Sequence, residues 1–178
     1  RVYWGGADGF DPQRRRDYPN VAGNFANAAD LDDDGYPELI LGACVHAEVA
    51  DRPDLGFSLY GGSGGGPALD RRTLLYEYGL GGTNIADLNR DGYLDLIATC
   101  NKKSREGEPK RVVIRYGGPE GYGTRTVIPW DGVGWSNVVA DFDRNGWLDI
   151  AASMIYENQF GILWGSPDGF SPERLTTV

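Results

Sequence analysis

Histidine, cysteine and methionine are scarce in this chain. Its 178 residues include one histidine, His46, two cysteines, Cys44 and Cys100, and one methionine, Met154. A single histidine argues against most catalysis that depends on imidazole. Two cysteines without a CxxC spacing do not suggest a disulfide framework or a zinc site. We interpret both as small buried hydrophobic residues, in preference to soft-metal ligands acting with Met154 and His46.

Basic residues and long apolar runs are also lacking. The chain has 17 basic against 26 acidic residues, a net charge of −9, which disfavours nucleic acid and anionic membrane surfaces as partners. No apolar run approaches the roughly 20 residues of a membrane span, so we expect no membrane insertion. The chain begins at Arg1 in the middle of a repeat unit, and we interpret it as part of a longer polypeptide.

Glycine, proline and aromatic residues are plentiful. There are 27 glycines, 10 prolines and 21 aromatic residues (10 Tyr, 6 Phe and 5 Trp). This composition favours short strands joined by tight turns over long helices. The sequence therefore predicts an all-β fold.

Two motifs recur along the chain. An acidic motif appears as "DLDDDGYPE" (30–38), "DLNRDGYLD" (87–95) and "DFDRNGWLD" (141–149), each followed by an apolar run. An aromatic residue followed by glycine alternates with it, at Trp4, Tyr60, Tyr116 and Trp164. We expect these aromatic residues to pack between repeats, because they recur at a similar place in each.

A repeat of roughly 50 residues that reads as four short strands is typical of a β-propeller blade. We predict about three and a half blades: a half blade over 1–20 and blades over 21–80, 81–132 and 133–178. In the middle blade the strands are expected near 83–86, 94–100, 111–116 and 123–129. Three and a half blades cannot close a ring, so the rest of a longer chain, or a neighbouring copy, would have to complete it.

The acidic motifs place oxygen-bearing side chains at positions 1, 3, 5 and 9, glycine at position 6, and a backbone carbonyl at position 7. Such a set of hard oxygen donors suits Ca²⁺ better than Mg²⁺, so we predict up to three calcium ions. The predicted ligands are Asp30, Asp32, Asp34, Tyr36 and Glu38; Asp87, Asn89, Asp91, Tyr93 and Asp95; and Asp141, Asp143, Asn145, Trp147 and Asp149.

An EF-hand is excluded, because position 12 is Leu41, Ala98 or Ala152 where that motif needs a bidentate glutamate. Asp33 falls between the ligand positions and is expected to face solvent. Glu38 stands where the other two loops have aspartate, so the first loop is the one expected to differ from the others.

The acidic loop followed by an apolar strand, repeated with an aromatic–glycine hairpin, resembles the FG-GAP/VCBS repeats of integrin α-subunit propellers and of many bacterial secreted proteins. The hairpin "WGSPDGF" (164–170) is closer to the bacterial group. The resemblance implies a calcium-binding propeller whose ligands are the residues named above. It also implies roles that range over adhesion, lectin activity and scaffolding, and sometimes accompany enzymes.

We therefore predict a non-catalytic, calcium-binding module, secreted or on the cell surface, that binds a protein or glycan partner. One alternative is a lectin in which exposed Trp130 or Trp135 stacks on a sugar ring. A lesser alternative is part of a polysaccharide-active enzyme. Two irregular segments, 46–56 and 101–111, are candidates for partner specificity, although both also fit ordinary solvated loops.

Overall fold

The computed structural model describes the chain except residues 20–22, 44–54, 103–106 and 155–158. The described residues form fourteen strands in four antiparallel sheets, and they contain no α-helix. The all-β prediction is confirmed. No helix in this part of the chain has the length and apolar character needed to cross a membrane.

Sheet A is a two-stranded hairpin, and sheets B, C and D each have four strands. Sheet A contains β1 (Val2–Gly6) and β2 (Gly9–Arg16). Sheet B contains β3 (Gly23–Ala29), β4 (Glu38–Ala43), β5 (Gly56–Tyr60) and β6 (Arg72–Tyr76). Sheet C contains β7 (Leu80–Ala86), β8 (Asp95–Cys100), β9 (Arg111–Tyr116) and β10 (Thr124–Pro129). Sheet D contains β11 (Val133–Ala140), β12 (Asp149–Met154), β13 (Phe160–Leu163) and β14 (Leu175–Thr177), with the 3₁₀ turn η2 (Pro172–Arg174) before β14.

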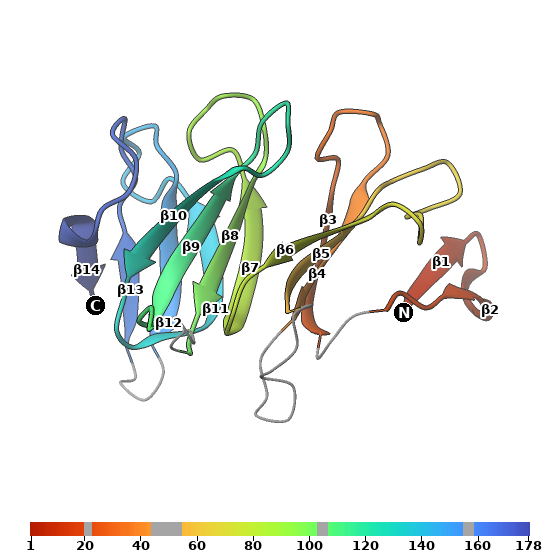
Figure 1. Ribbon diagram of the computed structural model, residues 1–178, viewed down its shortest axis with the longest axis horizontal. Helices are drawn as coiled ribbons and strands as arrows, with labels where there is room; N and C mark the ends of the chain where they lie inside the picture. The colour runs from red at the N-terminus through yellow and green to blue at the C-terminus, as the bar shows by residue number, and fades with distance from the viewer. Residues whose placement is uncertain (20–22, 44–54, 103–106, 155–158) are drawn as a thin grey trace.

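Within sheets B, C and D the spatial order of the strands is their order in the chain. The sheets follow one another in an open arc, with the β1–β2 hairpin at the end next to sheet B (Figure 1). All four strands predicted in the middle repeat are present, with small shifts at their ends. The local pattern was sufficient there because each strand is a short apolar run bounded by turn residues.

The core lies between the sheets. Ile40 and Phe57 of sheet B pack with Leu96 and Val113 of sheet C in one cluster. A second cluster joins Ile97, Val112 and Ile114 on the opposite face of sheet C to Ile150 and Leu163 of sheet D. The second strand of sheet C is covered on both faces, by sheets B and D, which explains why every residue of Asp95–Cys100 is buried.

One face of sheet D is left uncovered among the described residues. Phe160 pairs with Ser153 in the same register in which Val112 pairs with Thr99, so Phe160 and Val112 hold corresponding places. Val112 is fully buried against sheet D, whereas Phe160 is 46% exposed. Sheet D thus lacks, within this arc, the neighbour that covers the same face of sheet C.

The expectation that the aromatic residue holds a similar place in each repeat is wrong for Tyr60. Tyr60 pairs with Leu39, and the corresponding partner of Leu96 is Arg115, so Tyr60 corresponds to Arg115 and not to Tyr116. A shift of one residue turns a side chain to the other face of a sheet. Tyr60 is therefore buried against Tyr18 next to sheet A, with ring centroids 5.2 Å apart.

Candidate metal sites

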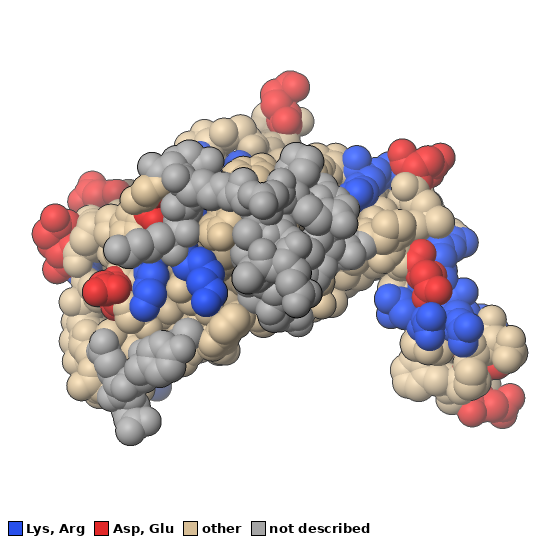
Figure 2. All heavy atoms as spheres, turned by 60° about the horizontal axis from the view of Figure 1, so that its bottom comes forward, with Lys and Arg blue, Asp and Glu red and all other residues tan. Residues whose placement is uncertain are grey.

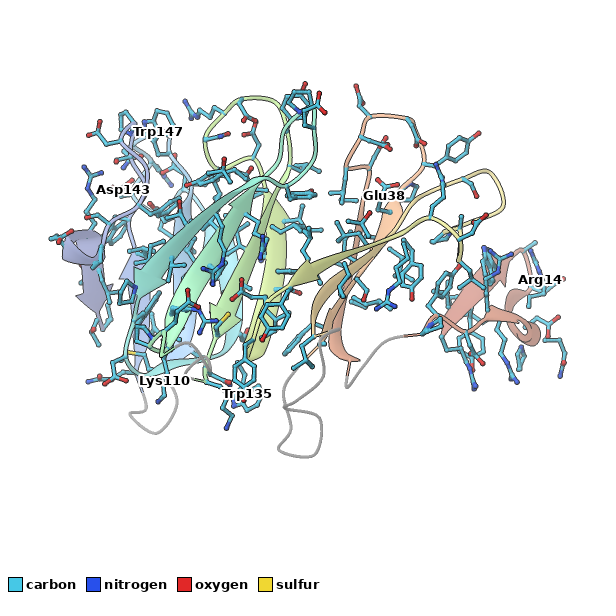
Figure 3. All side chains as sticks on the ribbon, viewed as in Figure 1. Arg14, Glu38, Lys110, Trp135, Asp143 and Trp147 are labelled. Carbon is cyan, nitrogen blue, oxygen red and sulfur yellow. The ribbon has the colours of Figure 1, made fainter. Side chains whose placement is uncertain are left out.

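The three acidic motifs form the turns between the first and second strands of sheets B, C and D. We call them loop 1 (30–38), loop 2 (87–95) and loop 3 (141–149). All three project from the same edge of the arc (Figure 1). Glu38 of loop 1 and Asp143 and Trp147 of loop 3 lie toward this edge in Figure 3. The repeat therefore places three acidic loops in a row along one rim.

Each loop bends through two residues with positive φ. Glycine at position 6 has φ of 86°, 90° and 91° in the three loops, a conformation that glycine adopts without steric cost. Position 4 also has positive φ, at 58° for Asp33, 63° for Arg90 and 61° for Arg144. The strain at position 4 was not expected from the sequence, because none of these side chains is glycine.

The carboxylate at position 1 accepts hydrogen bonds from the backbone of its own loop. In loop 1, Asp30 Oδ1 and Oδ2 accept the N–H groups of Asp34 at 3.1 Å and Gly35 at 2.9 Å. Asp87 and Asp141 accept the corresponding pairs of N–H groups in loops 2 and 3, at 2.9–3.2 Å. The bend is thereby closed around the first acidic side chain.

The acid at position 9 is buried and joins two segments of the chain. Asp149 Oδ2 accepts the N–H of Phe142 at 2.8 Å, and its Oδ1 accepts the N–H of Gly165 at 2.8 Å from the segment that follows β13. Asp95 makes the same two bonds, to Leu88 and Gly117.

Glu38 occupies the same register as Asp95 and Asp149. Its Oε2 accepts the N–H of Leu31 at 2.7 Å and its Oε1 accepts that of Gly62 at 2.5 Å, and the residue is 6% exposed. The extra methylene of glutamate does not remove it from the position that aspartate holds in the other loops. In this respect loop 1 matches its counterparts.

The glycine that donates to the position-9 acid lies against the backbone of the loop. A Cβ atom at Gly165 would lie 2.1 Å from Leu148 O, and one at Gly117 would lie 2.5 Å from Leu94 O. No side chain fits at such a distance. The spacing of these glycines from the position-9 acid varies, at 24, 22 and 16 residues, so the signal in the sequence is the aromatic–glycine hairpin and not a fixed distance from the acidic motif.

Carboxylate oxygens converge in loops 1 and 3. One oxygen from each of Asp30, Asp32 and Glu38 lies within 4.8 Å of the others, and the same holds for Asp141, Asp143 and Asp149. At position 3, loop 2 has the amide of Asn89 where loops 1 and 3 have a carboxylate. Asn89 Oδ1 accepts the N–H of Asp91 at 3.1 Å, much as Asp143 Oδ1 accepts that of Asn145 at 3.0 Å. All three loops thus combine oxygen donors of the kind that Ca²⁺ takes.

The environment of Asp95 in loop 2 disfavours its charged form when no cation is bound. Burial raises the pKa of Asp95 to about 6, although the hydrogen bonds from Gly117 and Leu88 act in the opposite direction. Asp91 and Asp87 raise it further, because like charges disfavour ionisation. A bound cation would relieve this cost.

Loops 2 and 3 also contact each other directly. The guanidinium of Arg90, at position 4 of loop 2, lies 4.7 Å from the ring centroid of Trp147, at position 7 of loop 3. A cation over an aromatic face is attracted by the ring electrons. The predicted ligand at position 7 is the backbone carbonyl, so the Trp147 side chain is available to contact the neighbouring loop.

The other residues named from the sequence as candidate binding residues differ in how far they are buried. Trp130 is 1% exposed and packs in the core between sheets C and D, as interblade packing requires, so the lectin alternative is wrong about this residue. Trp135 is 41% exposed (labelled in Figure 3). Cys100 is buried, and burial raises the pKa of its thiol well above the usual range. Cys44 and His46 lie outside the described residues.

Comparison with known proteins supports the repeat assignment. Residues 87–152, which run from loop 2 through loop 3 into β12, match the family model of the FG-GAP-like repeat. This segment is therefore similar to an FG-GAP-like repeat. The FG-GAP match spans two successive acidic loops and the strands between them, so it is longer than the repeat of roughly 50 residues and crosses from sheet C into sheet D. No curated protein matches the chain.

Proposed function

We propose that this chain is a calcium-binding, non-catalytic segment of a β-propeller that acts outside the cell and binds a protein or glycan partner. The observation that carries the proposal is the threefold repetition of one arrangement. In each loop an acid at position 1 closes the bend, and a buried acid at position 9 bridges the loop to the segment that follows the third strand of its sheet. The FG-GAP-like repeat agrees with a propeller architecture.

Calcium fits the donor set better than other common cations. The donors are carboxylate, amide and carbonyl oxygens on a turn, with no nitrogen or sulfur, and Ca²⁺ accepts such ligands in flexible geometry. Mg²⁺ prefers a stricter octahedron and retains its waters. The side chains at positions 1, 3, 5 and 9, with the carbonyl at position 7, would hold the ion. Bound calcium would offset two negative charges of each loop and fix the start of the second strand.

An extracellular location follows from the same chemistry. Extracellular calcium modules bind with Kd of about 10⁻⁴–10⁻³ M, so cytosolic calcium would leave such sites empty. An interaction role is favoured over catalysis because, among the described residues, the groups of three converging carboxylates belong to the loops themselves.

The uncovered face of sheet D supports the idea of further blades. Val138 and Phe160 on this face are 54% and 46% exposed, whereas the corresponding face of sheet C is buried. A further sheet, from a longer chain or from a neighbouring copy, would cover these apolar side chains as sheet D covers sheet C.

A calcium titration tests the proposal. We expect calorimetry of the calcium-free protein to give three ions, and Mg²⁺ to bind much more weakly. Asp32→Ala, Asn89→Ala and Asp143→Ala each remove one exposed position-3 ligand, so each should reduce the count by one. Asp33→Asn, which changes an exposed residue between ligand positions and preserves the positive φ, should leave it at three. Fewer than two ions at millimolar Ca²⁺ would contradict the proposal.

A lectin is the second candidate, and the exposed Trp135 is the observation that favours it. A tryptophan with an exposed face is suited to stacking on a sugar ring. Glycan-array binding should then be lost in Trp135→Ala and retained in Trp164→Phe, a conservative change of another partly buried tryptophan. Protein that binds no glycan, with or without a chelator, would exclude this alternative.

A further inference from the structure

The residue three positions before the first strand of a sheet differs between sheets C and D. It is Glu77 before β7, at the interface of sheets B and C, and Trp130 before β11, at the interface of sheets C and D. Trp130 N donates to Lys110 O at 3.0 Å, and Glu77 N donates to Leu55 O at 3.2 Å. These equivalent bonds place Trp130 and Glu77 at corresponding points of successive repeats. Trp130 fills the interface between sheets C and D, where it packs against Gly161. A glutamate takes its place between sheets B and C.

Three arginines surround this buried glutamate. Glu77 is 2% exposed, and its Oε1 accepts hydrogen bonds from Arg111 at 2.8 Å and Arg125 at 2.9 Å. Arg115 lies 3.5 Å from Oε2 and donates to Tyr76 O at 2.6 Å. Arg111 is 1% exposed, although it ends the irregular segment 101–111, which also fits a solvated loop. We call Glu77, Glu108, Arg111, Arg115 and Arg125 the arginine cluster.

The arginine cluster breaks the repeat. Arg115 and Arg125 pair directly across β9 and β10, in the register in which Leu163 and Leu175 pair in sheet D. Like charges opposite one another in an antiparallel pair are destabilising, whereas two leucines are favourable. Arg115 and Arg125 therefore do not stabilise the sheet as the two leucines do. We look for their role outside the stability of the sheet.

The cluster carries one positive charge in excess. It has three guanidinium groups against two carboxylates, and Arg125 is shared by both acids, at 2.8 Å from Glu108 and 2.9 Å from Glu77. Arg115 is the least compensated: its ion pair with Glu77 is the longest of the cluster at 3.5 Å, and its buried Nε has no hydrogen-bond partner among the described residues, whereas the equally buried Nε of Arg111 lies 3.2 Å from Glu108. Burial lowers the pKa of Arg115, although Glu77 acts in the opposite direction.

A cavity of about 310 Å³ adjoins the excess charge. The cluster lines it together with Tyr76 and Tyr78, and this volume is at the lower end of the range for small-molecule sites. Glu77 precedes β7 and Arg111 is the first residue of β9, and both strands begin at the lower end of sheet C in Figure 1. Basic and acidic side chains lie side by side on this lower face in Figure 2, over the sheets at the left.

We propose that the cavity binds a single carboxylate group, carried by a ligand no larger than a sugar residue, with Arg115 as its main partner. One carboxylate would bring the cluster to neutrality, and arginine forms charge-assisted, often bidentate bonds to carboxylates. A dianion such as sulfate would leave the site with an excess negative charge beside Glu77 and Glu108, so monoanions are preferred. Tyr76, which is 42% exposed, provides an aromatic wall beside the carboxylate.

The experiment is a titration of the calcium-saturated protein with glucuronate, followed by NMR or calorimetry. Methyl glucoside, of similar shape and no charge, is the matched ligand control, and N-acetylglutamate α-amide tests whether a peptide acid can supply the group. Saturable binding of either carboxylate, with none of the glucoside, is expected, and the tighter of the two identifies the source. No binding of either at about 10 mM, well above a Kd of 1 mM, overturns the proposal.

Variants test the assigned residue. Arg115→Leu, which introduces the side chain that Leu163 has in the next repeat, should weaken carboxylate binding at least tenfold, and Arg115→Lys should weaken it less. Arg174→Leu removes an arginine of sheet D outside the cluster and should have no effect. Unchanged binding in Arg115→Leu, or tighter binding of sulfate than of glucuronate, contradicts the assignment. Calcium is counted on the same samples, so failure of this site is distinguishable from failure of the calcium proposal. If Arg115→Leu does not fold, Arg115→Lys decides the question.

Discussion

Replacing Asp149 by alanine should destabilise the calcium-free protein much more than replacing Asp143, although both are predicted ligands of one ion. Asp149 is fully buried and accepts two backbone N–H groups, from Phe142 and from Gly165. Asp143 is exposed and accepts an N–H within its own loop. The two substitutions therefore separate the architectural role of the position-9 acid from metal binding.

The magnitude follows from the two lost bonds. A hydrogen bond to a charged acceptor contributes about 1.5–3 kcal/mol when buried, and the bond from Gly165 is buried whereas that from Phe142 is partly exposed. Removing a buried carboxylate also relieves its desolvation cost, which offsets part of the loss. We expect a net loss of about 2–3 kcal/mol for Asp149→Ala and of less than about 1 kcal/mol for Asp143→Ala.

Urea unfolding followed by tryptophan fluorescence, in a chelator, measures the difference. Adding 1 mM Ca²⁺ should stabilise the wild type more than either variant by about 1.4 kcal/mol, the linkage expected for one site with Kd near 10⁻⁴ M. If Asp149→Ala loses no more stability than Asp143→Ala in the chelator, the bridging role assigned to position 9 is refuted.

Three further predictions concern single residues. The pKa of Asp95 is raised to about 6 in the folded protein, so its ionisation destabilises the fold as the pH rises from about 4 to 6. Urea unfolding in a chelator should therefore show that the wild type loses stability relative to Asp95→Asn across that range. In a Cys44→Ser variant, the Cys100 thiol should resist alkylation at pH 8 until urea unfolds the chain, since burial raises its pKa; rapid labelling of the folded protein would contradict this. Gly165→Ala should lower the free energy of unfolding by at least about 2 kcal/mol, measured by thermal unfolding, because its Cβ would lie 2.1 Å from Leu148 O. Gly169→Asn should lower it by less than about 1 kcal/mol, because Gly169 has a φ of 80°, which asparagine tolerates, and open space around it.

The sheet strands and the acidic loops were predictable because their signals are local. The strand Arg111–Tyr116 matches its predicted bounds, since an apolar run between turn residues specifies a strand without reference to the rest of the chain. Glycine at position 6 of each loop likewise follows from the bend that the loop must make.

The register of the aromatic residues and the exposure of tryptophan were not predictable in this way. Tyr60 precedes a glycine pair as Tyr116 does, yet it pairs one position differently and faces sheet A. Trp130 lies in a stretch that reads as a turn, but its side chain is buried by sheet D, which is distant in sequence. Both outcomes depend on which strand or sheet lies opposite, and a single segment does not contain that information.

By itself, the sequence determined the all-β class, the repeating unit and the oxygen donors of the three loops, because each depends on composition and short-range spacing. Only the tertiary structure decided that the position-9 acids are buried bridges to the next hairpin, that a glutamate stands where its counterpart is tryptophan, and that three arginines gather around it. The physical reason is that burial and charge pairing arise between sheets. Residues such as Glu77 and Arg125, 48 positions apart, acquire their roles only when two sheets pack together.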